Sequence, residues 1–142
     1  MDNNAKVLWV QVSEDAIQGI DGSISLLRVL SEISSNKFPF KIPQLFFSAS
    51  ILSGESEKIK KQKLTITNNT DEVLYSNTDK NISIPKDSNP LNATKLIPPL
   101  EISNPGVIFV QFKITFDNDT TIESNKLEIH IVETKANPTE QS

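Results

Sequence analysis

The sequence predicts one all-β domain, built as a two-sheet antiparallel sandwich of about seven to nine strands. Short segments in which apolar and polar residues alternate recur about every eight to twelve residues. Residues that favour turns separate these segments, and no long segment has an apolar spacing that requires a helix. Because 142 residues is a common size for one domain, we expect a single hydrophobic core.

The predicted domain covers residues 1–133, and no internal repeat divides it. From Thr134 onward Ala136 is the only aliphatic residue besides proline. Residues 134–142 are therefore predicted to form a disordered tail.

The first predicted strand covers residues 7–12, which are mostly β-branched, aliphatic or aromatic and too few for a stable helix. This composition indicates a strand that is buried on both faces, with Trp9 in the core. Asp21 and Gly22 then supply the residues of a tight turn.

Residues 24–33 are compatible with two structures. Leu26, Val29, Leu30 and Ile33 have the spacing of an amphipathic helix. The segment also follows a hairpin-like turn and lies among predicted strands, which favours a strand from about residue 23 to residue 30.

A connector and a strand follow. Pro39 and Pro43 exclude a helix or a central strand from the segment that contains Phe38 and Phe40. Residues 45–52 alternate cleanly between apolar and polar side chains, apart from Phe46, and predict a strand.

The next segments predict a hairpin and a loop. Residues 58–67 and residues 73–75 lie on either side of turn-forming residues, which indicates a hairpin. Residues 77–92 are polar and contain two prolines, so they predict a long loop with a short strand at residues 81–84.

The C-terminal third contains the clearest strand. Residues 93–102 include two adjacent prolines and predict an irregular edge segment. Residues 107–116 alternate throughout and predict a central strand with one face in the core. Two further strands are expected at residues 120–123 and 127–131.

Charge and composition limit the classes of partner. Eighteen acidic and fourteen basic residues give a net charge of −4, which argues against nucleic acid or an anionic membrane as a partner. The chain has no cysteine, so it has neither disulfides nor thiolate chemistry. With no signal-like start and no apolar run of about 18 residues, we expect a cytoplasmic protein.

The candidates for chemistry are weak. His130 is the only histidine, and a lone imidazole does not make a catalytic triad. Asp117, Asn118, Asp119 and Glu123 offer oxygen ligands for calcium, but their spacing is that of an ordinary turn. We therefore predict no catalytic residue, no metal site and no cofactor, and we expect that the protein is not an enzyme.

One basic cluster consists of Lys58, Lys60, Lys61 and Lys63. Strict alternation puts Lys61 and Lys63 on one face of a strand, and Lys58 and Lys60 on the other. Lys58, Lys61 and Lys63 are candidate residues of a weak patch for phosphate or an acidic partner. The favoured interpretation is that these lysines prevent pairing between exposed strand edges.

Two aromatic residues are further candidates for binding. Phe38 and Phe40 lie in a loop that Pro39 and Pro43 restrict, where they can stack against a sugar or a partner. Phe46, like Trp9, is assigned to the core because it lies in an apolar strand.

A succession of segments resembles a known family. It comprises residues 7–12, the turn Asp21-Gly22-Ser23 before residues 24–30, Phe38-Pro39, the strand ending at Gly54-Glu55, and residues 71–74 and 105–109. Over about residues 6–133 the chain resembles a family of uncharacterised bacterial proteins, known only as a domain of unknown function. The resemblance implies a small immunoglobulin-like sandwich and supplies no catalytic residues. This chain lacks the glycine that such sequences often have in the Asp71-Glu72 turn.

We therefore expect a non-catalytic interaction module, bacterial or phage-derived, that binds a protein partner or a second copy of itself. A sheet edge or the loops at one end of the sandwich are the expected contact surfaces. The alternatives are a sandwich that binds carbohydrate or calcium, and a component of a phage or virion assembly. Neither nucleic acid nor a membrane is expected as a partner.

Overall fold

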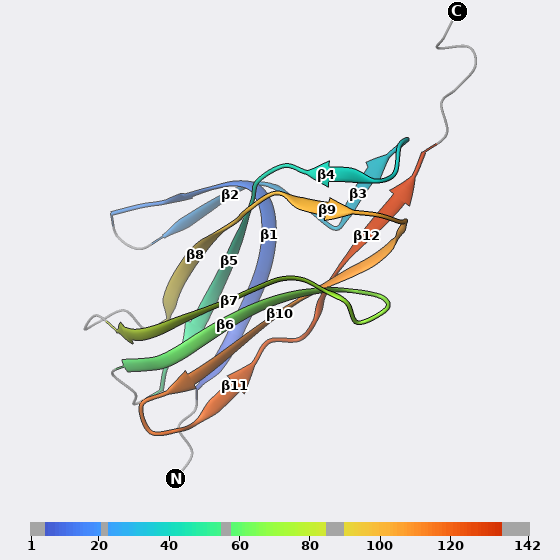
Figure 1. Ribbon diagram of the computed structural model, residues 1–142. Coiled ribbons are helices and arrows are strands. Elements are labelled where there is room, and N and C mark those ends of the chain that lie inside the picture. Colours follow the sequence, from blue (N-terminus) through green and yellow to red (C-terminus); the bar gives the residue numbers. More distant parts are fainter. Residues whose placement is uncertain (1–4, 21–22, 55–57, 85–89, 135–142) are drawn as a thin grey trace, which may run out of the picture.

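The computed structural model describes residues 5–20, 23–54, 58–84 and 90–134. In these residues the chain forms twelve strands (Figure 1). The same residues include no helix that is long and apolar enough to cross a membrane. The predicted all-β sandwich is confirmed. The strand count exceeds the predicted seven to nine because prolines and turns divide some predicted segments into two short strands.

The first sheet has four strands in the order β2-β1-β5-β8. Its strands are β1 (Lys6–Gln18), β2 (Ile24–Val29), β5 (Leu45–Leu52) and β8 (Leu91–Ile97). All neighbours in this sheet are antiparallel.

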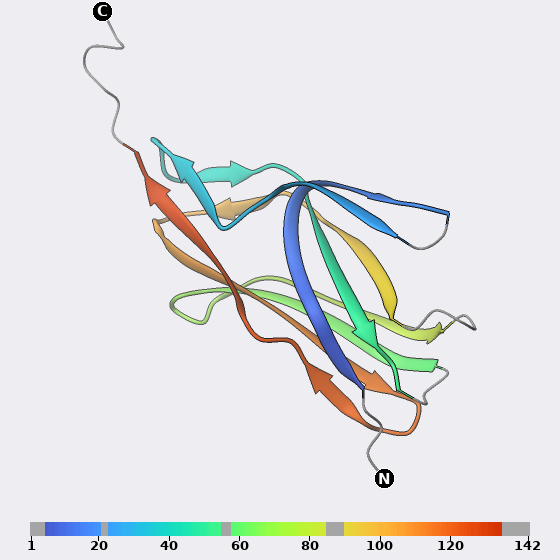
Figure 2. The ribbon, with the colours of Figure 1, turned by 180° about the vertical axis from the view of Figure 1, so that it is seen from behind.

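The second sheet has the order β3-β12-β10-β6-β7, with β11 also paired to β10. Its strands are β3 (Glu32–Ser35), β6 (Lys58–Asn68), β7 (Val73–Ser83), β10 (Gly106–Phe116), β11 (Thr121–Glu123) and β12 (Leu127–Glu133). All pairs are antiparallel except β12 with β3, which are parallel. A third, two-stranded sheet joins β4 (Phe40–Ile42) to β9 (Leu100–Ile102) at one end of the sandwich (Figures 1 and 2).

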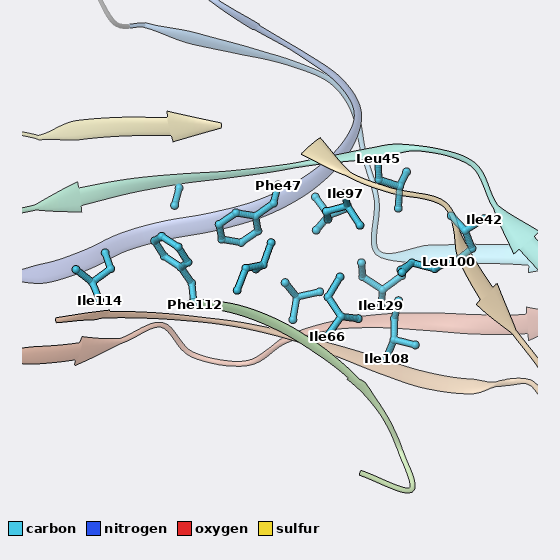
Figure 3. Close-up of a cluster of buried hydrophobic side chains, with 14 of the residues drawn as sticks. Ile42, Leu45, Phe47, Ile66, Ile97, Leu100, Ile108, Phe112, Ile114 and Ile129 are labelled. Atoms are coloured by element: carbon cyan, nitrogen blue, oxygen red, sulfur yellow. The ribbon is translucent and has the colours of Figure 1, made fainter. Parts of the chain in front are cut away.

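The hydrophobic core lies between the two large sheets (Figure 3). The rings of Phe47 on β5 and Phe112 on β10 meet there with their centroids 5.0 Å apart. Along β10, buried side chains alternate with more exposed ones, as the sequence predicted for a central strand. Burial of each large aliphatic or aromatic side chain stabilises the fold by about 1.5–3 kcal/mol. The buried apolar side chains are Val12, Ile42, Leu45, Phe47, Ala49, Ile51, Ile59, Leu64, Ile66, Ile97, Leu100, Ile102, Ile108, Val110, Phe112, Ile114, Phe116, Ile129 and Ile131.

The predicted hairpin is formed by β6 and β7, and its turn depends on one side chain. The Asn68 Oδ1 atom accepts hydrogen bonds from the Thr70 backbone N–H (2.9 Å), the Thr70 hydroxyl (2.7 Å) and the Glu72 N–H (2.9 Å). Asp71 has a φ of 64°, a left-handed conformation that glycine adopts most easily and that aspartate tolerates. This explains how the turn forms without the glycine of similar sequences.

The prediction of a long loop over residues 77–92 is wrong at residues 77–80 and 91–92, which lie in strands, whereas the short strand predicted at residues 81–84 is confirmed as part of β7 up to Ser83. β7 extends to Ser83 and pairs with β6 along its whole course, and β8 begins at Leu91. β7 lies at the edge of its sheet, where polar side chains replace the apolar alternation of an inner strand. Residues 85–89 lie outside the described residues.

Residues 24–29 and 32–33 lie in strands, so the favoured strand is confirmed and the helix alternative is wrong. β2 ends at Val29, and β3 starts at Glu32 and joins the other sheet. The predicted turn residues Asp21 and Gly22 lie outside the described residues, but the Gly19 N–H donates to the Ser23 carbonyl (2.7 Å), as in a hairpin.

The prediction that residues 7–12 are buried on both faces is also wrong. Leu8 is 43% exposed and Trp9 is 38% exposed, so Trp9 is not a core residue. Trp9 pairs with Ser50 on β5, on the outer face of a two-layer sandwich, where no third layer covers it. Phe46 also faces outward and is half-buried.

Of the predicted tail, only Thr134 is among the described residues. Its N–H donates to the Ser35 carbonyl (3.0 Å), which continues the parallel pairing of β12 with β3. Residues 135–142 lie outside the described residues.

Candidate interaction surfaces

The most prominent surface feature is a two-stranded arm formed by the β1–β2 hairpin. β1 pairs with β5 only as far as Ser13, whereas it pairs with β2 up to Gln18. Among the described residues, β1 beyond Ser13 pairs only with β2, and the arm projects from the sandwich (Figures 1 and 2). Its side chains include Ile17, which is 57% exposed, and Val29, which is 51% exposed.

The outer edge of the arm is open. β2 is the last strand of its sheet, and no strand within the described ranges pairs with its other side. The other end strands of the two large sheets differ from β2 in their charges. β3 carries Glu32, and β7 and β8 are joined by the ion pair of Asp79 with Lys95. The only charge on β2, Arg28, is paired with Glu14 on β1 (3.4 Å). β2 thus contains no lysine or proline, and its single exposed charge, Arg28, has a left-handed φ of 57°.

A second apolar feature lies where β1 faces the segment between β11 and β12. Leu8 and Trp9 line a shallow hollow of about 240 Å³ there, opposite Lys126 and Leu127. The register of β1 against β5 shifts between Val7 and Trp9, which turns Leu8 outward. The only tryptophan of the chain is therefore in contact with solvent.

The predicted basic cluster lies on an inner strand, because β6 is flanked by β10 and β7. The favoured interpretation, that its lysines prevent edge pairing, is therefore wrong, since both edges of β6 are already hydrogen-bonded. The predicted alternation fails at Lys60, where the pairing of β6 with β10 shifts by one residue, so that Ile59 is buried and both Lys60 and Lys61 are exposed.

The outer face of the second sheet gathers four lysines from three strands. Lys61 pairs with Lys80 on β7, and Lys63 pairs with Lys113 on β10. We call Lys61, Lys63, Lys80 and Lys113 the lysine face. Lys80 and Lys113 were missed by sequence reasoning, because neither belongs to a run of charges and only the strand pairing brings them to β6.

Few of these charges are neutralised. Lys113 lies 3.8 Å from Glu123, and outside the lysine face Lys60 is paired with Asp119 (2.9 Å). Within the described part of the chain, Lys61, Lys63 and Lys80 have no ion pair, and neither has the predicted candidate Lys58. A hollow of about 530 Å³ lies over this face, and its lining consists of Lys60, Lys61, Lys80, Asn81, Lys113, Thr115 and Thr121.

The two aromatic residues predicted to lie in a loop are less accessible than free surface residues, and Phe40 is the first residue of β4. Phe38 and Phe40 are half-buried, and their rings meet edge to face with centroids 5.2 Å apart. Both side chains pack against the hydrophobic core beside the small β4–β9 sheet. They are separated from the lysine face in the fold, so the structure does not join the two groups of candidates into one site.

The residues weighed for chemistry remain apart. His130 is exposed and pairs with Glu32 on β3, while its neighbours Ile129 and Ile131 are buried. Asn118 and Asp119 form a turn, in which the Asn118 Oδ1 atom accepts from the Thr120 N–H (3.0 Å). The described residues contain no group of histidine, aspartate and glutamate side chains that could hold a metal ion.

A polar cluster connects the edge strands of the two large sheets. Lys95 on β8 donates a hydrogen bond to Asp79 on β7, and Gln62 on β6 also donates to Asp79 (3.4 Å). The Lys95 ammonium holds the pKa of the Asp79 carboxyl below its usual value, against the opposing effect of desolvation. Near it, the buried Asn77 Oδ1 atom has no hydrogen-bond partner among the described residues.

The fold and its surfaces define a small β-sandwich protein with two sheets facing a single core. The chain belongs to a family of unknown function, DUF6941, which matches residues 9–132. The resemblance predicted from the sequence is therefore confirmed. No protein with a curated description matches the sequence significantly.

Solved structures are similar to this chain at low sequence identity, and the first of those named here shares its fold. The C-terminal domain of wzt has a TM-score of 0.57 and 15% identity, with 96% of this chain and 77% of that chain covered. CopC from Methylosinus trichosporium OB3b has a TM-score of 0.46 and 10% identity, covering 94% and 99% of the two chains. The soluble domain of PmoD from Methylocystis sp. ATCC 49242 (Rockwell) has a TM-score of 0.45 and 10% identity, covering 92% and 99%.

Proposed function

We propose that the protein is a non-catalytic, self-assembling module in which two copies pair through the β2 edges of their arms. The observation that carries this proposal is the two-stranded arm with an open apolar edge. A hairpin of only two strands is marginally stable in water, and it gains stability when further strands extend it.

Pairing of one β2 with the β2 of a second copy joins the two arms into a four-stranded ribbon. A two-fold axis brings the same edge of both copies together, so one open edge is sufficient for a closed dimer. The new pairing satisfies backbone N–H and C=O groups of β2 and places Val29 on the paired strand, while Ile17 lies on the next strand, β1, of the same ribbon. β2 has no lysine or proline, so the only charge at this contact is Arg28, which Glu14 of the same arm already pairs.

The test is light scattering across a protein concentration series. We expect the wild type to approach the mass of two chains as its concentration rises. The double variant Ile17→Lys/Val29→Lys should stay monomeric, because it places two like charges on the arm of each copy.

A matched control is Val73→Lys/Leu96→Lys. These residues are 57% and 47% exposed, close to the exposure of Ile17 and Val29, and the change in net charge is the same. The control should dimerise like the wild type. A wild type that is monomeric at every concentration contradicts the proposal, and so does equal dissociation of both variants.

A further inference from the structure

The lysine face is an unusual arrangement for this chain. The protein has a net charge of −4, yet four lysines from β6, β7 and β10 lie on one face of the sheet. Directly opposed residues on antiparallel strands have Cβ atoms about 4.5–5.5 Å apart, and like charges there destabilise the sheet. The pairs Lys61–Lys80 and Lys63–Lys113 are both of this kind.

Protection of a sheet edge does not explain these lysines, because β6 and β10 are inner strands. Ion pairs with acidic residues of the same chain do not explain these lysines either. Glu123 approaches Lys113 at 3.8 Å, while Lys61, Lys63 and Lys80 lack an ion pair within the described ranges. An anionic ligand that bridges the strands would reverse the repulsion.

We propose that the lysine face docks an acidic segment of a partner protein. The hollow of about 530 Å³ is open and shallow. Three residues of the lysine face, Lys61, Lys80 and Lys113, line it, and Thr115, Thr121 and Asn81 add hydrogen-bond donors; Lys63 is not part of the lining. Such a surface suits several carboxylates of an extended segment that crosses β7, β6 and β10. Neighbouring strands are about 4.8 Å apart, so successive acidic side chains can reach lysines on different strands.

The observations favour carboxylates of a protein over phosphates of a nucleic acid. The face contains lysines and no arginine, so it lacks the planar fork that binds phosphate in a bidentate manner. The net negative charge of the chain repels a long polyanion, whereas a short acidic segment meets mainly the local positive field. The lysine face lies on a different sheet from the arm, so this proposal and the dimer proposal stand or fall separately.

The experiment measures binding of a fluorescein-labelled oligoglutamate peptide by fluorescence anisotropy at low and at physiological salt. We expect binding that weakens as salt rises, and a loss of about tenfold in affinity for Lys63→Ser/Lys80→Ser. The control Lys6→Ser/Lys41→Ser removes two exposed lysines elsewhere and should bind within about twofold of the wild type. Thermal unfolding of both variants verifies that they fold, and removal of opposed lysines should not lower stability.

Four results would overturn the proposal. One is that the wild type does not bind the peptide even at low salt. Another is that both double variants lose affinity equally, which would show only a general charge effect. Tighter binding of a single-stranded oligoadenylate than of oligoglutamate would assign the face to nucleic acid instead. A response to inorganic pyrophosphate without any response to the peptide would assign it to a free phosphate ligand.

Discussion

At the scale of single residues, Asn68 shows how one side chain can shape a turn. It follows β6 directly and satisfies three donors of the turn with one oxygen atom. The sequence pattern predicted a turn at this position from its composition, but it could not show that Asn68 accepts all three bonds while Asp71 takes the left-handed conformation.

Replacement of Asn68 by alanine should lower the free energy of unfolding by about 1–2 kcal/mol, because hydrogen bonds to two backbone N–H groups and a hydroxyl are lost. Urea unfolding at a fixed protein concentration measures the change. Asn118→Ala is the matched control, since Asn118 also lies in a hairpin turn but accepts one bond, from the Thr120 N–H. Equal losses in the two variants would contradict the special role of Asn68.

At the scale of secondary-structure elements, the pair of Asp79 and Lys95 links the edge strands β7 and β8 of opposite sheets. The pKa of Asp79 is lowered in the folded protein. Because the pKa is lowered in the folded state, the charged carboxylate stabilises the fold fully at pH values above the unfolded-state pKa near 3.8. This stabilisation disappears as the pH falls through the lower pKa of the folded state.

Asp79→Asn should therefore be less stable than the wild type at neutral pH, and the difference should vanish in acid below the folded-state pKa of Asp79. Because the Asp79 side chain is 41% exposed, we expect a difference below about 1 kcal/mol. Urea unfolding as a function of pH measures it, with Asp117→Asn as a control on an exposed turn residue. A difference that persists unchanged in acid would show that packing, not charge, is responsible.

The elements that the sequence predicted well are those whose own pattern decides their structure. β10 alternates between buried and exposed positions along its length, and this periodicity requires a strand with one face in the core. β7 was missed because its polar side chains at a sheet edge leave no apolar period. The sequence also left residues 24–33 between helix and strand, since the spacing of Leu26, Val29 and Leu30 alone fits both.

At the scale of the whole molecule, the candidate surfaces arise from pairing between distant segments. Lys58, Lys61 and Lys63 could be predicted as a cluster, but Lys80 and Lys113 join the same face only through the register of β7 and β10 with β6. The arm likewise depends on where β5 stops pairing with β1, which no local pattern of Ile17 or Val29 reveals. Trp9 was assigned to the core because composition does not show which sheet face lacks a covering layer.

The central claim is that the β2 edge of the arm pairs with a second copy, and hydrogen–deuterium exchange of the amides of β2 tests it most directly. Edge pairing predicts that amides of Ile24–Val29 become more protected as the protein concentration rises, while those of β10 do not change. Ile17→Lys/Val29→Lys should remove this concentration dependence. Exchange of the β2 amides at the same rate at every concentration would contradict the claim.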